Sequence, residues 1–233
     1  RKKGDVALQL TARQDTNIFV PMPKEQRNMH DEFQLSVSML VTKWKRAHFL
    51  TETDQRRLLL LLSQMRMVCD STFILDQKTR FDTKIEEALN LISSIVESGD
   101  DKIVLFSQWE RMTRLVAQEL ELAGIKYEYL YGGVPSAKRK GLMDRFNSQS
   151  EIRVFLSTDA GATGLNLQSA SYVINRDMPW NPAVLEQRIG RIYRIGQQRN
   201  IQVFNLVAVN SIEEQMLLKL KFKSDMFAGV LDN

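Results

Sequence analysis

From residue 102 onward, short apolar runs rich in β-branched residues alternate with stretches of helical periodicity. This alternation limits the fold more than any other feature of the chain. The runs that we expect to be strands are Lys102–Phe106, Tyr127–Leu130, Arg153–Leu156, Tyr172–Asn175 and Ile201–Leu206. The expected helices are Glu110–Ala123, Ser136–Phe146, Val184–Ile195 and a last one from Ser211 to about Phe227. Strands that are apolar on both faces and alternate with helices predict a doubly wound α/β fold with a parallel sheet.

The chain before this pattern is expected to be mainly helical. A short extended piece, Thr16–Val20, ends at Pro21, and helical spacing of apolar residues follows. The expected helices cover Lys24–Lys45, Thr51–Cys69 and Lys84–Glu97. We therefore expect a boundary near residue 98, with a helical region over 1–97 and the α/β domain over 98–233.

Composition excludes several classes of protein. The 233 residues are 43% hydrophobic with only 11 Gly and 5 Pro, which excludes collagen-like and low-complexity chains. The longest apolar run, Leu58–Leu62, is far shorter than the ~20 residues of a membrane span, and no apolar leader follows Arg1–Lys3. We therefore expect no membrane association. A net charge of +4 permits a polyanionic partner without requiring one.

Several chemistries lack the residues that they need. The single cysteine, Cys69, excludes an internal disulfide and fits a reducing compartment. Cys69, His30 and His48 do not have the spacing of a zinc site, and they form no convincing nucleophile–base set. The sequence also contains neither a phosphate-binding G-x-x-x-x-G-K-[ST] loop nor a G-x-G-x-x-G turn after a strand. We therefore expect no metal site and an incomplete hydrolytic site.

The segment STDAGATGLNLQ follows the expected strand that ends at Leu156. Loops at the carboxyl ends of parallel strands meet ligands, and small residues let the backbone approach a phosphate. An ordinary strand-to-helix turn explains the glycines equally simply. Taken alone, this segment favours the ordinary turn.

The segment QRIGRIYRIGQ is more specific. Arg188, Arg191 and Arg194 are three residues apart, so on a helix they would form one ridge of like charges beside a buried isoleucine face. Such a ridge is stabilised by an anion, and guanidinium groups suit phosphate. A solvated basic helix face is the alternative interpretation.

These segments resemble a known family. STDAGATGLNLQ, MPWNP and QRIGRIYRIGQ resemble motifs five and six of the superfamily-two helicases, and the closing RIGQ resembles the Swi/Snf-type branch. KIVLFSQW is similar to motif four, and YGGVP to the segment that follows it. The likeness covers about residues 98–227. Residues 1–97 more loosely resemble the stretch that joins the two motor lobes of that branch.

The resemblance implies a RecA-like second lobe of a DNA-dependent ATPase. It implies that Arg191 and Arg194 are arginine fingers for ATP that is held, with Mg²⁺, mainly on a first RecA-like lobe of the same natural protein. Gly164 and Asn166 would line the nucleotide side of the cleft between the lobes. Gln187 and Arg188 would couple nucleotide state to lobe closure.

The resemblance also implies contacts with double-stranded DNA. Ser107, Gly132 and Thr158 would face the phosphates of the tracked strand, with Lys138 and Arg139 as helpers. A DNA-bound protein cargo would be a further partner. The implied compartment is cytoplasmic in a bacterium, which we favour, or nuclear in a eukaryote.

Two other functions stay open. Gly190 stands where many Swi/Snf-type proteins have Asp, and the resulting R-x-G-R form is closer to RNA helicases, so an RNA helicase lobe is one alternative. A non-catalytic RecA-like binding module is the other. Under the leading interpretation, we expect the isolated chain to hydrolyse ATP negligibly, because the lobe that holds ATP is absent from this sequence.

Overall fold

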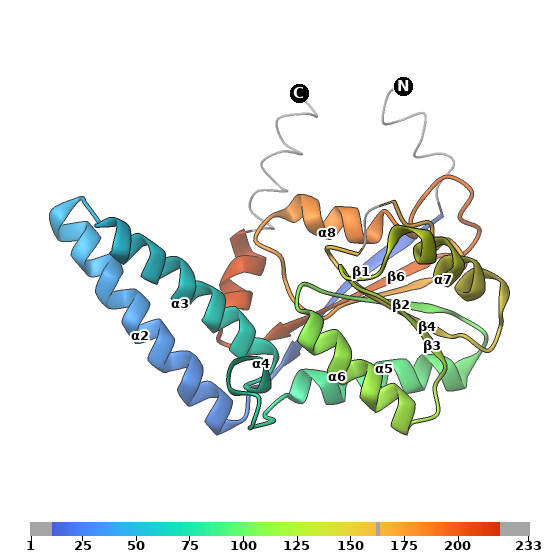
Figure 1. Ribbon diagram of the computed structural model, residues 1–233, viewed down its shortest axis with the longest axis horizontal. Coiled ribbons are helices and arrows are strands. Elements are labelled where there is room, and N and C mark those ends of the chain that lie inside the picture. The colour runs from blue at the N-terminus through green and yellow to red at the C-terminus, as the bar shows by residue number, and fades with distance from the viewer. Residues whose placement is uncertain (1–10, 162–163, 220–233) are drawn as a thin grey trace.

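One parallel sheet organises the computed structural model, which describes residues 11–161 and 164–219 (Figure 1). The strand order is β1-β6-β5-β2-β4-β3, and each neighbouring pair runs parallel. The strands are β1 (Arg13–Val20), β2 (Ile103–Ser107), β3 (Tyr127–Leu130), β4 (Val154–Thr158), β5 (Tyr172–Asn175) and β6 (Ile201–Ala208). After β4 the chain crosses β2 to reach β5 and then winds outward the other way. The doubly wound α/β fold expected from the sequence is confirmed.

Helices cover both faces of the sheet. α5 (Thr83–Ser98) and α6 (Glu110–Leu122) lie on one face, and α7 (Ser136–Ser148) and α8 (Pro182–Ile189) lie on the other (Figure 1). Ile103 and Leu105 of β2 belong to the apolar core under α5 and α6, whereas Val104 and Phe106 belong to the core under α7 and α8. This alternation explains why β2 reads as an unbroken apolar run.

A helical hairpin projects from the carboxyl end of the sheet, beyond the ends of β1 and β6 (Figure 1). It consists of α2 (Lys24–Ala47) and α3 (Glu52–Asp70), and the short α4 (Phe73–Asp76), which the sequence did not predict, follows. Thr51 caps α3 by accepting a hydrogen bond from the Asp54 amide at 3.2 Å. The base of α3 packs through Met65 and Cys69 on the end of β6. The two long helices expected here are confirmed.

The first 97 residues also build the sheet. β1 pairs with β6 over all eight of its residues, three more at its start than the expected extended piece. Its polar start is tolerated at the sheet edge, where the Arg13 guanidinium pairs with Asp15 and with Glu186 of α8. α5 adds Ala88 and Ile92 to the core. The expected division near residue 98 therefore does not separate two cores.

The last described element is the helix over residues 212–219. Ser211 opens it, with its hydroxyl oxygen accepting from the Glu213 amide at 3.1 Å. Glu214 reaches back to the Asn210 amide at 2.6 Å. The predicted continuation to about Phe227 lies outside the described residues.

Candidate functional site

Three polar segments meet where β2, β4 and β5 end. Ser107 closes β2 and is paired in register with Thr158 at the end of β4, while Asp177 follows β5 by two residues. All three side chains are at most 3% exposed. This carboxyl edge of the sheet, next to the change in winding direction, is where open α/β sheets bind ligands.

Arg188 of α8 ties these segments together. Its Nε and Nη2 donate to the Asp159 carboxylate at 2.6 and 2.9 Å. The same guanidinium donates to the carbonyl and to Oδ1 of Asp177, both at 2.9 Å. The other oxygen, Oδ2 of Asp177, accepts from the Ser107 hydroxyl at 2.5 Å and from the Gln108 amide at 2.8 Å. We call Arg188, Asp159, Asp177 and Ser107 the Arg188 cluster.

The charges of this cluster stabilise one another. Burial alone would raise the pKa of Asp177, but the Arg188 charge and the Ser107 hydrogen bond outweigh it, and the pKa lies below its usual value. Burial alone would lower the pKa of Arg188, but the carboxylates of Asp177 and Asp159 raise it. The Asp177 carboxylate and the Arg188 guanidinium are therefore ionised at neutral pH. Removal of the buried Arg188 cation would leave the Asp159 and Asp177 carboxylates without a compensating charge.

The predicted ridge of three arginines is wrong, because α8 ends at Ile189 rather than at Ile195. Gly190, a poor helix former, follows, and the next amides donate to carbonyls three residues back, from Arg191 to Arg188 and from Ile192 to Ile189. The side chains consequently diverge. Arg188 is 1% exposed and engages carboxylates, so it does not present a free guanidinium to a ligand.

Arg191 and Arg194 lie in the turns that follow α8, and both are half-buried. Nε of Arg191 is buried and finds no hydrogen-bond partner among the described residues. Arg194 donates from Nε to the Gly190 carbonyl at 2.7 Å. Burial and the neighbouring Arg194 charge lower the pKa of Arg191. The pair is thus close enough to repel, and an anion between the two groups would relieve the repulsion.

The other residues predicted at the nucleotide side are exposed. Gly164 adopts φ +75°, and a Cβ there would meet no atom within 4 Å, so backbone conformation rather than space requires glycine. Asn166 is exposed, and its carbonyl accepts from the Asn147 side chain at 3.2 Å. Gln187 is exposed on α8. The Leu167 amide donates to the Arg191 carbonyl at 3.0 Å, which places this loop beside the arginine pair.

The predicted DNA contacts divide into buried and exposed groups. The Ser107 hydroxyl is held by Asp177, and the Thr158 hydroxyl accepts from the Gly161 amide at 3.3 Å. Neither hydroxyl faces solvent in this conformation, so only the loops that they anchor are exposed. Gly132 and Lys138 are exposed, and Arg139 is half-buried with its Nε donating to the Val134 carbonyl at 3.0 Å.

A glycine of the STDAGATGLNLQ segment has a packing role. A Cβ on Gly161 would lie 2.9 Å from the Leu130 carbonyl oxygen, so glycine is needed for close approach to the end of β3. A Cβ on Gly132 would lie 3.3 Å from Cβ of Ala160. The loops after β3 and β4 therefore touch, which brings the Gly132 turn to the same edge as Thr158. Residue 162 of this segment lies outside the described residues.

Three residues of this edge were missed from the sequence. Asp159 and Asp177 follow strands β4 and β5, and acidic residues directly after two buried strands were a signal that could have identified them. Arg66 of α3 reaches the same edge, with Nη2 donating to Oε1 of Gln108 at 2.6 Å. No sequence pattern marks Arg66, because its partner is 42 residues away along the chain.

Two features are absent from residues 11–161 and 164–219, a metal-binding cluster and a membrane-spanning helix. No group of three or more His, Cys, Asp or Glu side chains there could hold a metal ion. Within the same ranges, no helix is both long enough and apolar enough to cross a membrane.

Comparison with known proteins gives the family. Residues 83–196 match the family described as "Helicase conserved C-terminal domain". The chain is 34% identical over 163 residues to the Bacillus subtilis "Uncharacterized ATP-dependent helicase YqhH", which aligns 70% of this chain with 28% of that protein. It is 29% identical over 238 residues to mouse "SWI/SNF-related matrix-associated actin-dependent regulator of chromatin subfamily A member 1", covering 96% of this chain and 22% of that protein. The chain therefore spans about a quarter of the length of these relatives.

A solved structure shares the fold. The "Sulfolobus solfataricus SWI2/SNF2 ATPase core in complex with dsDNA" superposes with a TM-score of 0.75 at 26% identity, over 92% of this chain and 45% of that chain. The chain belongs to the Swi/Snf-type branch of the superfamily-two helicase-like ATPases and forms their C-terminal, RecA-like lobe.

Proposed function

We propose that this chain is the second motor lobe of an ATP-dependent translocase on double-stranded DNA. ATP would lie between this lobe and a first RecA-like lobe of the same natural protein, and hydrolysis would open and close the cleft. Two kinds of relative support this proposal. The Bacillus subtilis relative is named an ATP-dependent helicase, and the Sulfolobus core is described in complex with dsDNA.

The observation that carries the proposal is the arginine pair after α8. Arg191 holds a buried Nε without a partner among the described residues, and it lies near the like charge of Arg194. Such a pair suits the γ-phosphoryl group of ATP, whose transferring oxygens carry negative charge in the transition state. An arginine finger is worth about three to five decades of rate in related phosphoryl transfer. We assign this role to Arg191 and Arg194.

The neighbouring residues would form the nucleotide side of the cleft. Gly164, Asn166 and Gln187 are exposed beside the arginine pair, which suits contact with ATP or with the first lobe. Arg188 would act at a distance from the nucleotide. Its bonds to Asp159 and Asp177 would fix the loops after β4 and β5 to α8, so that closure at the arginine pair moves the DNA-facing loops.

DNA would lie along the loops after β2, β3 and β4. Ser107 and Thr158 would anchor those loops through buried hydroxyls, and Gly132 would offer an exposed backbone to a phosphate. Lys138 and Arg139 on α7 would add positive charge. Closing and opening of the cleft would then move phosphate contacts along the duplex without requiring strand separation.

Mg²⁺ and most ATP contacts are assigned to the first lobe. The residues of this lobe that reach the nucleotide are guanidinium and amide donors, which suit phosphate oxygens rather than a cation. No step of this lobe is therefore routed through the metal ion. A DNA-bound protein would be the cargo, and the compartment would be the cytoplasm in a bacterium or the nucleus in a eukaryote. The isolated chain would hydrolyse ATP negligibly.

An RNA helicase lobe is the second candidate, and Gly190 favours it. That position ends α8 and separates Arg188 from Arg191 in the R-x-G-R form typical of RNA helicases. A non-catalytic binding module is disfavoured by the intact Gln187, Arg191 and Arg194.

The test is ATP hydrolysis by the full-length natural protein without nucleic acid, with duplex DNA and with RNA, beside the isolated chain. We expect strong stimulation by duplex DNA and negligible turnover by the isolated chain. Stimulation by RNA alone would assign the protein to the RNA helicase alternative. Absence of hydrolysis in every arm would leave only a binding module, and appreciable turnover by the isolated chain would contradict the two-lobe mechanism.

A further inference from the structure

Arg66, on the hairpin helix α3, is buried at the functional edge of the sheet although it belongs to neither the nucleotide nor the DNA motifs. Its side chain is buried, with a residue exposure of 4%. Nη2 donates to Oε1 of Gln108 at 2.6 Å and to the Met178 carbonyl at 2.9 Å. These acceptors lie in the loops after β2 and after β5. One guanidinium nitrogen therefore bridges two loops that approach from different strands.

Two tryptophans complete the surroundings of this guanidinium. Its central carbon lies 5.7 Å from the ring centroid of Trp109 and 5.5 Å from that of Trp180. Trp109 follows β2 and Trp180 follows β5, so each loop contributes one polar acceptor and one aromatic face. Cation–π contacts of this kind are stronger when the cation is desolvated. The arrangement holds the two loops at a fixed separation.

Packing alone does not account for an arginine at this position. Arg66 makes no direct ion pair among the described residues, although its charge helps to lower the pKa of Asp177, and its Nε has no hydrogen-bond partner there. Burying a cation in this way is costly, and an apolar residue of similar volume would fill the same space more cheaply. A guanidinium that donates from Nη2 to acceptors in two loops and lies over two indole rings gives orientation that an apolar side chain cannot.

The loop after β2 is held from its other side by the Arg188 cluster. The Gln108 amide and the Ser107 hydroxyl both donate to Oδ2 of Asp177. Gln108 thus bonds Asp177 through its backbone and Arg66 through its side chain. Of these two supports, only Arg66 comes from the hairpin, so displacement of α3 would be transmitted to the loop that carries Ser107.

We infer that Arg66 is a positioning residue that clamps the loop after β2 to the loop after β5 and so fixes the backbone that meets duplex DNA. The inference rests on the proposed function, because it assigns the positioned loop to DNA. It gives the α2–α3 hairpin a mechanical connection to the DNA-facing edge. Loss of these contacts of Arg66 should weaken the stimulation of ATP hydrolysis by DNA more than it lowers the rate of hydrolysis at saturating DNA.

The test measures ATP hydrolysis by the full-length protein against duplex DNA concentration. Loss of two hydrogen bonds from a charged donor predicts that Arg66→Met raises the DNA concentration for half-maximal stimulation about tenfold, or about 1.4 kcal/mol, while the rate at saturating DNA falls less. Gln108→Ala removes one acceptor of Arg66 and should also raise the half-maximal DNA concentration, by a smaller factor. Arg66→Lys keeps the charge without the fork and should restore part of the response.

Leu61→Ala is the matched control, because Leu61 is buried on the same helix and makes no polar contact with either loop. It should lower the melting temperature without changing the half-maximal DNA concentration. A melting temperature lowered in Arg66→Met with an unchanged half-maximal concentration, or an equal shift in Leu61→Ala, would overturn the inference and leave Arg66 a packing residue. Absence of DNA stimulation in the unsubstituted protein would instead refute the proposed function.

Discussion

One arginine holds the loops at each end of the sheet, but the two arginines bind different kinds of group. At the carboxyl edge, Arg188 pairs with the buried Asp177 and with Asp159. At the amino edge, Arg153 donates to the backbone carbonyls of Val96, Gly99 and Asp101 at the end of α5. The first arginine holds charged groups from motif loops in place. The second caps a helix.

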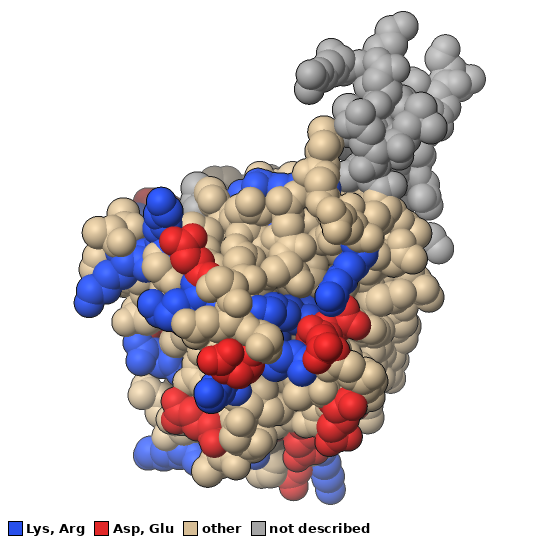
Figure 2. All heavy atoms as spheres, turned by 90° about the vertical axis from the view of Figure 1, so that its right-hand side faces the viewer, with Lys and Arg blue, Asp and Glu red and all other residues tan. Residues whose placement is uncertain are grey.

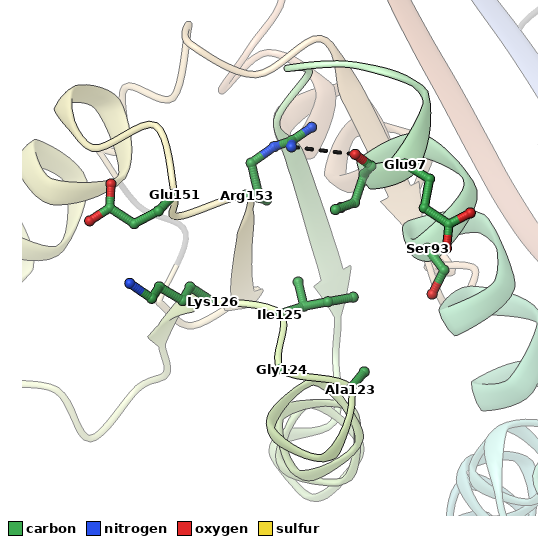
Figure 3. Close-up of a pocket in the computed structure, with 9 residues that line it drawn as sticks. Ser93, Glu97, Ala123, Gly124, Ile125, Lys126, Glu151 and Arg153 are labelled. Carbon is green, nitrogen blue, oxygen red and sulfur yellow. Dashed lines mark hydrogen bonds between the residues drawn. The ribbon is translucent and has the colours of Figure 1, made fainter.

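The amino edge also shows that a hollow with charged side chains around it does not by itself make a site. A hollow of about 450 Å³ lies beside Arg153, between the ends of α5 and α6 (Figure 3). The residues around the hollow include Glu97, Glu151 and Lys126. The surface of the molecule at this end of the sheet carries both acidic and basic side chains (Figure 2). The guanidinium beside it is already engaged. The turns after α8 instead leave Arg191 and Arg194 without a carboxylate partner among the described residues.

Of the two arginines, Arg188 is the one whose replacement should lower the stability most. Arg188→Met leaves Asp159 and Asp177 without their cation, and we expect the free energy of unfolding to fall by about 3–5 kcal/mol. Urea denaturation followed by circular dichroism measures it. A loss below about 1 kcal/mol would show that the cluster is solvated and that the edge is not organised by Arg188.

A smaller loss is expected at the other edge. Arg153→Met removes hydrogen bonds to neutral carbonyls that solvent can partly replace, so we expect a fall of about 1–2 kcal/mol. The same denaturation experiment gives the value. In the full-length protein, this variant should retain DNA-stimulated hydrolysis. A large loss of stimulated activity at matched stability would place function at the amino edge and contradict the purely structural role of Arg153.

The pH dependence of stability distinguishes two buried carboxylates near the carboxyl edge. The pKa of Asp177 is lowered, so its contribution is present above the unfolded value near 3.9 and is lost as pH falls through the folded one. Burial raises the pKa of Asp70 to about 7, although Lys84 and Arg176 partly oppose it. The contribution of Asp70 is therefore present at low pH and lost as pH rises toward 7.

Denaturation between pH 2 and pH 8 tests these opposite signs, because the Asp177 contribution is lost below about pH 4 and that of Asp70 between about pH 4 and pH 7. Asp70→Asn should make the free energy of unfolding rise more, or fall less, with pH than in the unsubstituted chain, by at most about 1.4 kcal/mol per pH unit. In Asp177→Asn, the free energy of unfolding should fall less on acidification than in the unsubstituted chain. Parallel pH profiles for both variants and the unsubstituted chain would contradict the assigned directions.

The smallest expected effect concerns surface charge. Lys138→Ala on α7 should change the free energy of unfolding by less than about 0.5 kcal/mol. In the full-length protein it should reduce the salt dependence of DNA binding by about one unit of slope, since one phosphate contact is lost. Lys126→Ala at the amino edge is the control. Equal slopes for the two variants would remove Lys138 from the DNA interface.

The sequence predicted the regular elements better than the contacts between them. β3 and β5 have the predicted bounds because each is a short apolar run between clear turn signals. The helix that carries the start of the arginine motif was predicted, but it ends at Ile189, whereas the prediction extended it to Ile195. Apolar periodicity continues there even though the backbone has changed to turns. The pairing of polar β1 with β6 and the partners of Arg66 depend on tertiary neighbours, which local patterns do not encode.

The role of Arg191 as an arginine finger is tested by the DNA-stimulated rate constant of hydrolysis in the full-length protein with Arg191→Ala. Arg199→Ala is the matched control, because Arg199 is a nearby arginine that pairs with Asp101 at 2.8 Å. The account predicts a loss of about three decades or more for Arg191→Ala at unchanged DNA affinity, with Arg199→Ala near the unsubstituted rate. A rate for Arg191→Ala within about twofold of the unsubstituted protein, which is less than 0.5 kcal/mol in the barrier, would contradict it.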